Sequence, residues 1–109
     1  RGVLDGVRLL GPRTVDFMTR NHLGPALLPY NNATAPGAGF GLGFEVTLDP
    51  ALCGRLDSVG SYGWGGAAAT QFWVDPQQDL VALIMPQLLG CPYPLKHQYH
   101  ALVYQALID

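Results

Sequence analysis

The sequence predicts an α+β fold in which an antiparallel sheet of about four strands is flanked by helices. Apolar residues alternate with small or polar ones from Phe40 to Val46, a period of two that is typical of a strand with one buried face. Apolar residues from Tyr99 to Leu107 recur at the i, i+3, i+4, i+7 spacing of a helix that packs by one face. Asp75-Pro76 has the residues of a type I turn between two strand-like runs.

The N-terminal part predicts a small turn followed by a helix. Asp5-Gly6 is typical of a tight turn that joins two short extended pieces. Gly11-Pro12 predicts the start of a helix, because proline is favourable in a first helical turn, and Gly24-Pro25 predicts its end. The segment Leu23–Gly39 is rich in Pro, Gly, Ala and Asn, which predicts a long loop.

The remaining elements follow in the order strand, strand, strand, strand, helix. After Phe40–Val46 we expect strands at about Ser58–Trp64, Ala67–Val74 and Leu80–Gln87, and a final helix at about Pro94–Ile108. The fourth run is continuously apolar, so we expect both of its faces to be covered. One helix covers only one face of a sheet, and we therefore expect something outside this chain to cover the other.

The composition limits the classes of partner. Charged residues make up 13% of the chain, against about 25% in a typical soluble domain, which suggests that part of the surface is covered by something else. A net charge of −2 with six scattered basic residues gives no electrostatic case for nucleic acid or an anionic membrane. The longest apolar run, Leu80–Met85, is too short for a membrane span.

The chain begins with Arg1 rather than Met, so we expect a piece of a longer protein whose N-terminal part is missing. No signal peptide or tag is recognisable near Arg1, and the compartment cannot be read from targeting. Cys53 and Cys91 are expected to be free thiols, with a disulfide between them as the alternative. Asn32-Ala33-Thr34 matches the N-glycosylation pattern, which matters only in a secreted eukaryotic protein.

A glycine cluster surrounds one aromatic residue just before the third strand-like run. Glycines crowded beside a strand indicate that another backbone or a ligand approaches the main chain closely. The cluster contains Gly60, Gly63, Trp64, Gly65 and Gly66.

The triplet Trp64-Gly65-Gly66 resembles the third active-site box of the serine β-lactamase-like hydrolases, such as class C β-lactamases and family VIII carboxylesterases. In that family a Lys-Thr-Gly, His-x-Gly or Trp-Gly-Gly triplet lies on a strand that lines the catalytic cleft. Further segments resemble the family in the same order: Gly2–Leu10, Arg13–Met18, Phe40–Val46 and Val74–Val81. The resemblance implies that residues 1–109 are the C-terminal part of a single β-lactamase-like domain.

The resemblance also implies that the nucleophile lies outside this chain. The family takes its nucleophile and base from Ser-x-x-Lys, helped by a Tyr-x-Asn motif. The only serines here are Ser58 and Ser61 and the only lysine is Lys96, so Ser-x-x-Lys is absent. Tyr30-Asn31-Asn32 spells Tyr-x-Asn, but it lies too close to Trp64 for the family's catalytic tyrosine. We therefore expect this chain alone to be inactive.

By resemblance, the chain supplies one wall of the site. The backbone N–H of Ala67 corresponds to an oxyanion-hole donor, and Gly65 and Gly66 leave room for the acyl group. Trp64 stands where the penicillin-recognising members have a lysine, which favours neutral esters over β-lactams. The expected activity is that of a carboxylesterase that forms an acyl-enzyme on a small ester or amide, without a cofactor.

Two other readings of the family resemblance stay open. The protein could be a non-catalytic binding or scaffold relative, with Trp64 as a core aromatic, or a β-lactamase or peptidase of the same fold. The upstream sequence would distinguish the enzyme from the scaffold.

Several other polar residues predict structural roles. His22, His97 and His100 have no cysteine or carboxylate at metal-ligand spacing, and we expect solvated or capping histidines rather than a zinc site. Asp75 is expected to cap its own turn through its side chain. Phe72 and Trp73 are adjacent, and we expect them to face opposite sides of a strand.

Overall fold

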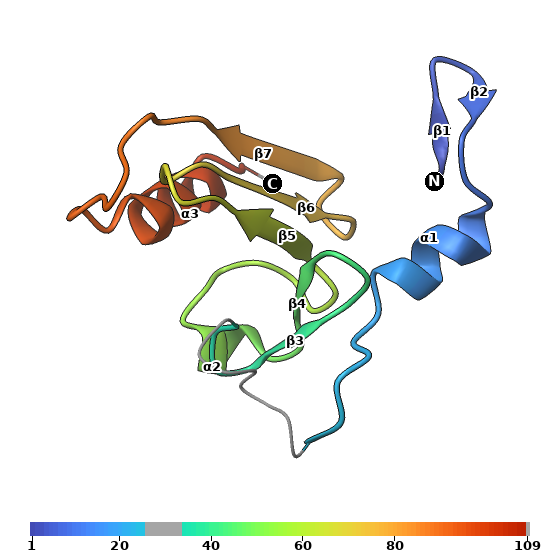
Figure 1. The fold of residues 1–109 in the computed structure, drawn as a ribbon, viewed down its shortest axis with the longest axis horizontal. Helices are drawn as coiled ribbons and strands as arrows, with labels where there is room; N and C mark the ends of the chain where they lie inside the picture. The colour runs from blue at the N-terminus through green and yellow to red at the C-terminus, as the bar shows by residue number, and fades with distance from the viewer. Residues whose placement is uncertain (26–33, 109) are drawn as a thin grey trace.

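A five-stranded antiparallel sheet organises the chain in the computed structural model, which describes residues 1–25 and 34–108. The strands lie in the order β3-β4-β5-β6-β7, so neighbours in the sequence are neighbours in the sheet (Figure 1). They are β3 (Ala38–Phe40), β4 (Glu45–Thr47), β5 (Tyr62–Gly65), β6 (Gln71–Asp75) and β7 (Leu80–Ile84). The predicted α+β class and antiparallel meander are confirmed, with five strands rather than about four.

A two-stranded hairpin and three helices complete the described part of the chain. The hairpin, β1 (Val3–Leu4) and β2 (Val7–Arg8), lies to one side of the main sheet (Figure 1). Its predicted turn is confirmed, since Asp5 and Gly6 both have positive φ, as a two-residue hairpin loop requires. The helices are α1 (Pro12–Met18), α2 (Pro50–Cys53) and α3 (Leu95–Gln105).

The prediction of one strand over Phe40–Val46 is wrong, because this segment turns back on itself. Phe40 ends β3 and pairs with Glu45 at the start of β4, and the Gly41 N–H donates to the Phe44 carbonyl at 2.7 Å. The backbone of Met18 lies against Gly41, so a side chain at Gly41 would collide with the Met18 carbonyl. Gly41 and Gly43 produced the apparent period of two in the sequence. In the structure Gly41 allows close backbone packing and Gly43 lies in the turn.

The boundary predicted for the third strand is also wrong. β6 begins at Gln71, and residues 67–70 form the turn that precedes it. Two hydrogen bonds close this turn, from Gly66 N–H to Thr70 O at 2.9 Å and from Ala69 N–H to Gly66 O at 3.1 Å. Ala69 adopts a positive φ of 65°. A run of alanines carries no turn residue, so the sequence pattern gave no sign of this bend.

Helix α3 packs through aromatic rings against one face of the sheet. Trp73 of β6 is 4% exposed, and its ring centroid lies 5.5 Å from that of Tyr99 and 6.3 Å from that of Tyr104. The predicted apolar stripe is only partly correct, since Leu102 is 62% exposed. His100 takes a place on the buried face instead, with its ring centroid 4.6 Å from that of Trp73.

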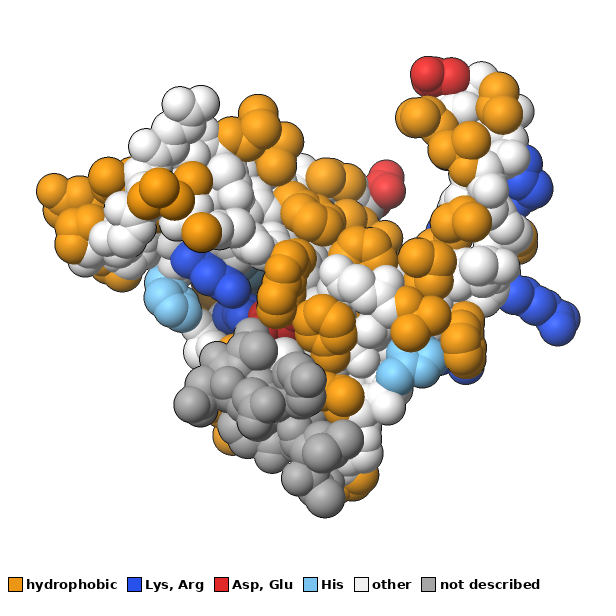
Figure 2. Space-filling model, in the orientation of Figure 1, with side chains coloured by type: hydrophobic (Ala, Val, Ile, Leu, Met, Phe, Trp, Pro, Cys, Tyr) orange, Lys and Arg blue, Asp and Glu red, His pale blue; other side chains and the backbone are white. Residues whose placement is uncertain are grey.

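The opposite face of the sheet carries exposed apolar side chains. Val81 and Leu83 on β7 and Met85 just after it are all exposed, Met85 to 71%. Hydrophobic side chains gather over β7 in the space-filling view (Figure 2). β7 was predicted to be covered on both faces, and within the described part of the chain only the face toward α3 is covered.

Candidate functional site

The segment Trp64–Ala67 runs from the end of β5 into the turn before β6 and is exposed along its whole length. Its position depends on close pairing with β6. Gly63, just before it, has no room for a side chain, because a Cβ there would collide with the backbone of Phe72 and Trp73. Gly65 then pairs with Gln71, and the Gly66 N–H is used by the turn. The structure thus brings the four predicted site residues together as one surface ridge.

Two surface hollows lie along this ridge and share Gly65 and Gly66. The first has a volume of about 390 Å³ and an apolar lining on the β7 side. Its apolar side chains are Trp64, Phe72, Leu83 and Met85. The second has a volume of about 370 Å³, and Ala67 lines it. Its larger side chains include Thr70, Cys91, Tyr93 and Lys96.

The Ala67 N–H is an exposed donor without an acceptor in residues 1–25 and 34–108. The N–H groups of Gly66 and Ala69 in the same turn donate to backbone carbonyls, whereas that of Ala68, like that of Ala67, has no acceptor in the described part of the chain. Trp64 is held in place by an edge-on contact with Phe40, at 5.0 Å between ring centroids. The ridge therefore offers a fixed apolar wall, a strip without side chains and one unused backbone donor.

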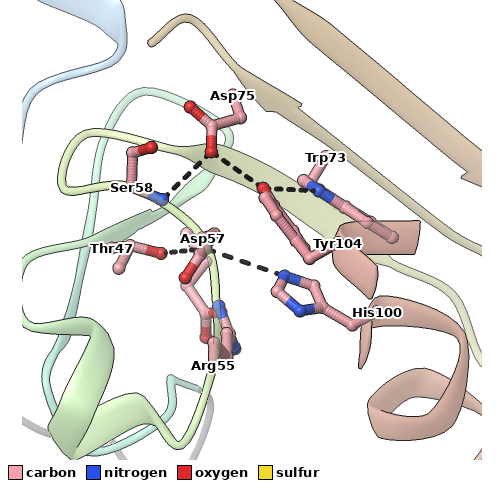
Figure 3. Close-up of polar contacts among 9 residues, drawn as sticks. Thr47, Arg55, Asp57, Ser58, Trp73, Asp75, His100 and Tyr104 are labelled. Carbon is pink, nitrogen blue, oxygen red and sulfur yellow. Dashed lines mark hydrogen bonds and ion pairs between the residues drawn. The ribbon is translucent and has the colours of Figure 1, made fainter. Parts of the chain in front are cut away.

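On the covered side of the sheet lies a group of buried polar side chains that the sequence did not predict (Figure 3). Thr47 Oγ1 donates to Asp57 Oδ2 at 2.7 Å, and burial raises the pKa of the Asp57 carboxyl. Arg55 pairs with Glu45 at 2.5 Å. His100 Nε2 lies 3.8 Å from Asp57 Oδ2, too far for a hydrogen bond. The Arg55–Glu45 ion pair is thus the close charge pair of this group.

The expectation of a solvated or capping His100 is wrong, because the ring is buried between Trp73 and the loop that carries Asp57. Burial lowers the pKa of His100 to about 4, and the charges of Arg55 and Lys96 act in the same direction. The imidazole is therefore neutral at pH 7.

Asp75 anchors the end of β6 to both the preceding loop and the final helix. The predicted turn cap is confirmed, since Asp75 Oδ1 accepts from Gln77 N–H at 3.0 Å. Oδ2 accepts from Ser58 N–H at 3.0 Å and from Tyr104 Oη at 2.8 Å, and Tyr104 Oη accepts from Trp73 Nε1 at 3.2 Å (Figure 3). Burial alone would raise the pKa of Asp75, but these hydrogen bonds hold it below its usual value.

The other residues singled out from the sequence lie away from the ridge or outside the described residues. Cys53 is a buried free thiol and Cys91 a partly exposed one, as expected. Tyr30-Asn31-Asn32 lies outside the described residues, as does most of Asn32-Ala33-Thr34. Among the described residues, no three His, Cys, Asp or Glu side chains form a group that could hold a metal ion, and no helix is long and apolar enough to cross a membrane.

The sequence has curated relatives in Mycobacterium tuberculosis, although no protein-family profile matches it. Protein Rv1367c is 36% identical over 97 residues, which cover 84% of this chain and 24% of the relative. Uncharacterized protein MT1414, from another strain, gives the same values. The chain thus spans about a quarter of the length of these relatives.

Solved structures also match this chain over only part of their own length. EstCE1, described as a hydrolase with promiscuous acyltransferase activity, superimposes with a TM-score of 0.77 at 26% identity, over 91% of this chain and 26% of EstCE1. The simvastatin synthase LovD from Aspergillus terreus superimposes with a TM-score of 0.69 at 27% identity, over 94% of this chain and 31% of LovD. Both have the serine β-lactamase-like fold, and the match falls on its C-terminal part. The chain therefore has the serine β-lactamase-like fold and corresponds to the C-terminal part of that fold, as the sequence predicted.

Proposed function

We propose that residues 1–109 are the C-terminal part of a single β-lactamase-like domain in a serine hydrolase that acts on neutral esters through an acyl-enzyme. The observation that carries this proposal is the ridge Trp64–Ala67, with a hollow on either side and an unused donor at its end. The nucleophile and its base belong to the part of the protein that precedes this chain. No cofactor takes part.

The Ala67 N–H is assigned to the oxyanion. When a serine attacks the substrate carbonyl, negative charge develops on the carbonyl oxygen, and a fixed backbone donor stabilises that charge without reorganising. The second donor would be the N–H of the nucleophile itself, as the family resemblance implies. Because the Ala67 donor belongs to the backbone, the identity of its side chain matters only through its size.

The glycines and the apolar hollow are assigned to the acyl group. Gly65 and Gly66 have no side chains, so a substrate can lie against their backbone. The neighbouring hollow has Trp64, Phe72 and Leu83 in its lining, which suits a hydrocarbon acyl chain. Trp64 is uncharged, so this position offers no cationic side chain to bind a carboxylate, and a neutral substrate is favoured.

The exposed apolar surface of β7 beyond this hollow, which includes Val81, is assigned to contact with the preceding part of the same domain. A contiguous apolar patch is uncommon on an isolated soluble monomer and marks an interaction site. The description of EstCE1 as a hydrolase with acyltransferase activity supports an acyl-enzyme route for the complete protein.

The test uses the full-length protein with a short p-nitrophenyl ester and a serine-reactive fluorophosphonate. We expect a burst of nitrophenol of about one equivalent, followed by steady turnover, and covalent labelling of one serine upstream of this chain. Residues 1–109 alone should show neither activity nor labelling. A chromogenic β-lactam and a peptide amide serve as competing substrates.

The alternatives give different results in the same assays. Faster hydrolysis of the β-lactam or the peptide than of any neutral ester would contradict the substrate assignment and favour a β-lactamase or peptidase. A correctly folded protein that neither hydrolyses any of these substrates nor becomes labelled would be the non-catalytic binding or scaffold relative.

A further inference from the structure

The second hollow beside the ridge, which Ala67 lines, has no substrate group assigned to it so far. Its volume is about 370 Å³, and it lies between the turn at residues 66–70 and the segment 90–96, where α3 begins. The Leu88 N–H donates to the Ala68 carbonyl at 3.2 Å and joins these two parts of the chain. We propose that this hollow binds the alcohol part of the ester, and that this alcohol carries further hydroxyl groups, as in a glycerol ester. The inference rests on the proposed function and names the substrate class of the same site.

The position of the Ala67 donor assigns the alcohol to this hollow. The carbonyl carbon of an ester bears the acyl chain and the alkoxy oxygen, which point away from each other and from the carbonyl oxygen. The carbonyl oxygen is assigned to the Ala67 N–H and the acyl chain to the apolar hollow beside Trp64. The alkoxy group then points across the two glycines of the ridge, and both hollows share these glycines. Each substituent of the carbonyl thus has a hollow of its own.

Unpaired polar side chains line the second hollow. Tyr93 Oη and Lys96 Nζ form no hydrogen bond or ion pair with residues 1–25 and 34–108. The Thr70 hydroxyl is also unpaired within this part of the chain, and it lies over the ridge, because a Cβ at Gly66 would collide with Thr70 Oγ1. The hollow therefore has three polar groups that are free to bind a ligand.

Gln71 adds a buried polar group to the same lining. It is 8% exposed, and its Oε1 has no hydrogen-bond partner in the described ranges. It pairs with Gly65 across β5 and β6, so its side chain lies on the face where Gly65 has none. A buried amide without a partner lowers stability. A half-turn of the amide exchanges its oxygen and nitrogen, so Gln71 can accept from a ligand or donate to it.

The mixture of donors and acceptors favours hydroxyl groups over a carboxylate. The hydroxyls of Thr70 and Tyr93 and the amide of Gln71 both donate and accept, and only Lys96 is restricted to donating. A carboxylate accepts only and would leave the acceptors unmatched, whereas a hydroxyl group donates and accepts. Lys96 is the one charged side chain in the lining and would repel a cationic alcohol. A neutral alcohol with several hydroxyl groups is the match.

The alcohol occupies this hollow only until acylation is complete. The serine oxygen forms a bond to the carbonyl carbon, the bond from that carbon to the alkoxy oxygen breaks, and the alkoxy oxygen takes up the proton that the serine lost. Water then hydrolyses the acyl-enzyme and restores the serine. The contribution of the hollow therefore belongs to kcat/KM of the ester and not to the hydrolysis of the acyl-enzyme.

A set of esters tested with the full-length protein checks the proposal. Glycerol monobutyrate and propyl butyrate share one acyl group and differ in two hydroxyl groups on the alcohol. We expect kcat/KM to be about tenfold higher for the glycerol ester, the size expected from two neutral hydrogen bonds. Propyl 3-hydroxybutyrate carries its hydroxyl on the acyl group and should show no gain over propyl butyrate, because the acyl hollow is apolar. The butyrate ester of glycolate, with a carboxylate on the alcohol, completes the set.

The outcomes separate this inference from the function on which it rests. Equal values for the glycerol and propyl esters, in a protein that gives the nitrophenol burst, would overturn the inference and leave the proposed function intact. A higher value for the glycolate ester than for the glycerol ester would also overturn it, since the hollow would then select a carboxylate. A protein without a burst contradicts the proposed function and this inference with it.

Substitutions locate the preference in the hollow. Lys96→Met keeps the length of the side chain and removes its donors, and we expect the ratio of the two kcat/KM values, glycerol ester over propyl ester, to fall by about three- to tenfold. Thr70→Val, which replaces a hydroxyl with a methyl group, should lower the same ratio. His97→Gln is the matched control, because His97 is the next residue of α3 and lines a different hollow. A parent-like ratio in both Lys96→Met and Thr70→Val would contradict the proposal, as would an equal fall in His97→Gln.

Discussion

The ridge Trp64–Ala67 and the anchor of helix α3 lie on the same pair of strands but are built in opposite ways. The ridge is exposed, has two glycines, and keeps the Ala67 donor unused. The anchor is buried, has large aromatic rings, and gives Asp75 Oδ2 two hydrogen-bond donors. Changes in the anchor should therefore reduce the stability of the fold, whereas changes in the ridge should reduce chemistry and leave stability nearly intact.

The largest effect on stability is expected for Trp73→Ala in the full-length protein. Its ring contacts Tyr99, His100 and Tyr104, so removing it creates a cavity between the sheet and α3. Substitutions of this kind cost about 3–5 kcal/mol. Chemical denaturation measures the change, and turnover per folded molecule should stay close to that of the parent. A loss under about 1 kcal/mol would show that α3 is not anchored through this ring.

The pH dependence of stability should reveal the buried, neutral His100. Its pKa is lowered from 6.5 to about 4 in the folded protein. Between pH 6.5 and pH 4 this histidine is therefore protonated in the unfolded chain and neutral in the folded protein. Stability is therefore fully present above pH 6.5 and falls as the pH falls toward 4, by at most about 3 kcal/mol. Asp57 acts in the opposite direction as the pH falls from its folded pKa to its ordinary value of 3.8, because its folded pKa is raised by burial.

Denaturation midpoints at pH 7.5 and pH 5 check this prediction. The His100→Gln variant serves as the control, since it has no titrating ring, and its midpoint should change less between the two pH values. An equal change in the parent and the variant would contradict the assignment to His100.

A smaller effect is expected for Tyr104→Phe, which removes one hydroxyl and keeps the ring. The hydroxyl joins Trp73 Nε1 to Asp75 Oδ2, so its loss leaves both groups short of a partner. We expect a loss of about 1–3 kcal/mol of stability with unchanged turnover. If the denaturation midpoint equals that of the parent, the hydroxyl does not anchor the helix.

The sequence predicted those features that depend on local chemistry. The Asp5-Gly6 hairpin and the Asp75 turn follow from the residues themselves, and both are present. The segment Phe40–Val46 was misread because Gly41 packs against the backbone of Met18 and Arg20, which are distant in the sequence, and Gly43 adopts a positive φ in the turn. His100 was misread for a similar reason, since only the tertiary fold places it against Trp73. The periodicity of apolar residues shows which positions alternate along the chain, but it does not show which distant backbone segments lie beside them.

The ridge was located from its glycines and its resemblance to a family, and the structure adds its exposure and the two hollows. Nothing in the sequence indicates the buried polar group of Thr47, Asp57 and His100, because these residues come from separate segments. A buried polar cluster has no periodic signature, and its members are individually ordinary surface residue types.

Gly66→Val in the full-length enzyme tests the catalytic role of the ridge most directly. The substitution places a branched side chain beside the Ala67 donor, and loss of one oxyanion donor costs about 100- to 1000-fold in kcat. Because a Cβ at Gly66 also approaches Thr70 Oγ1, the double variant Gly66→Val/Thr70→Ala removes that collision. Gly24→Val, where the added atoms meet open space, is the matched control.

The measurement is kcat for a short p-nitrophenyl ester, together with the denaturation midpoint of each variant. We expect both Gly66→Val variants to lose about 100- to 1000-fold in kcat with midpoints near that of the parent, and Gly24→Val to match the parent in both respects. A parent-like kcat in Gly66→Val, or its recovery in the double variant, would contradict the assignment of Trp64–Ala67 to the catalytic wall.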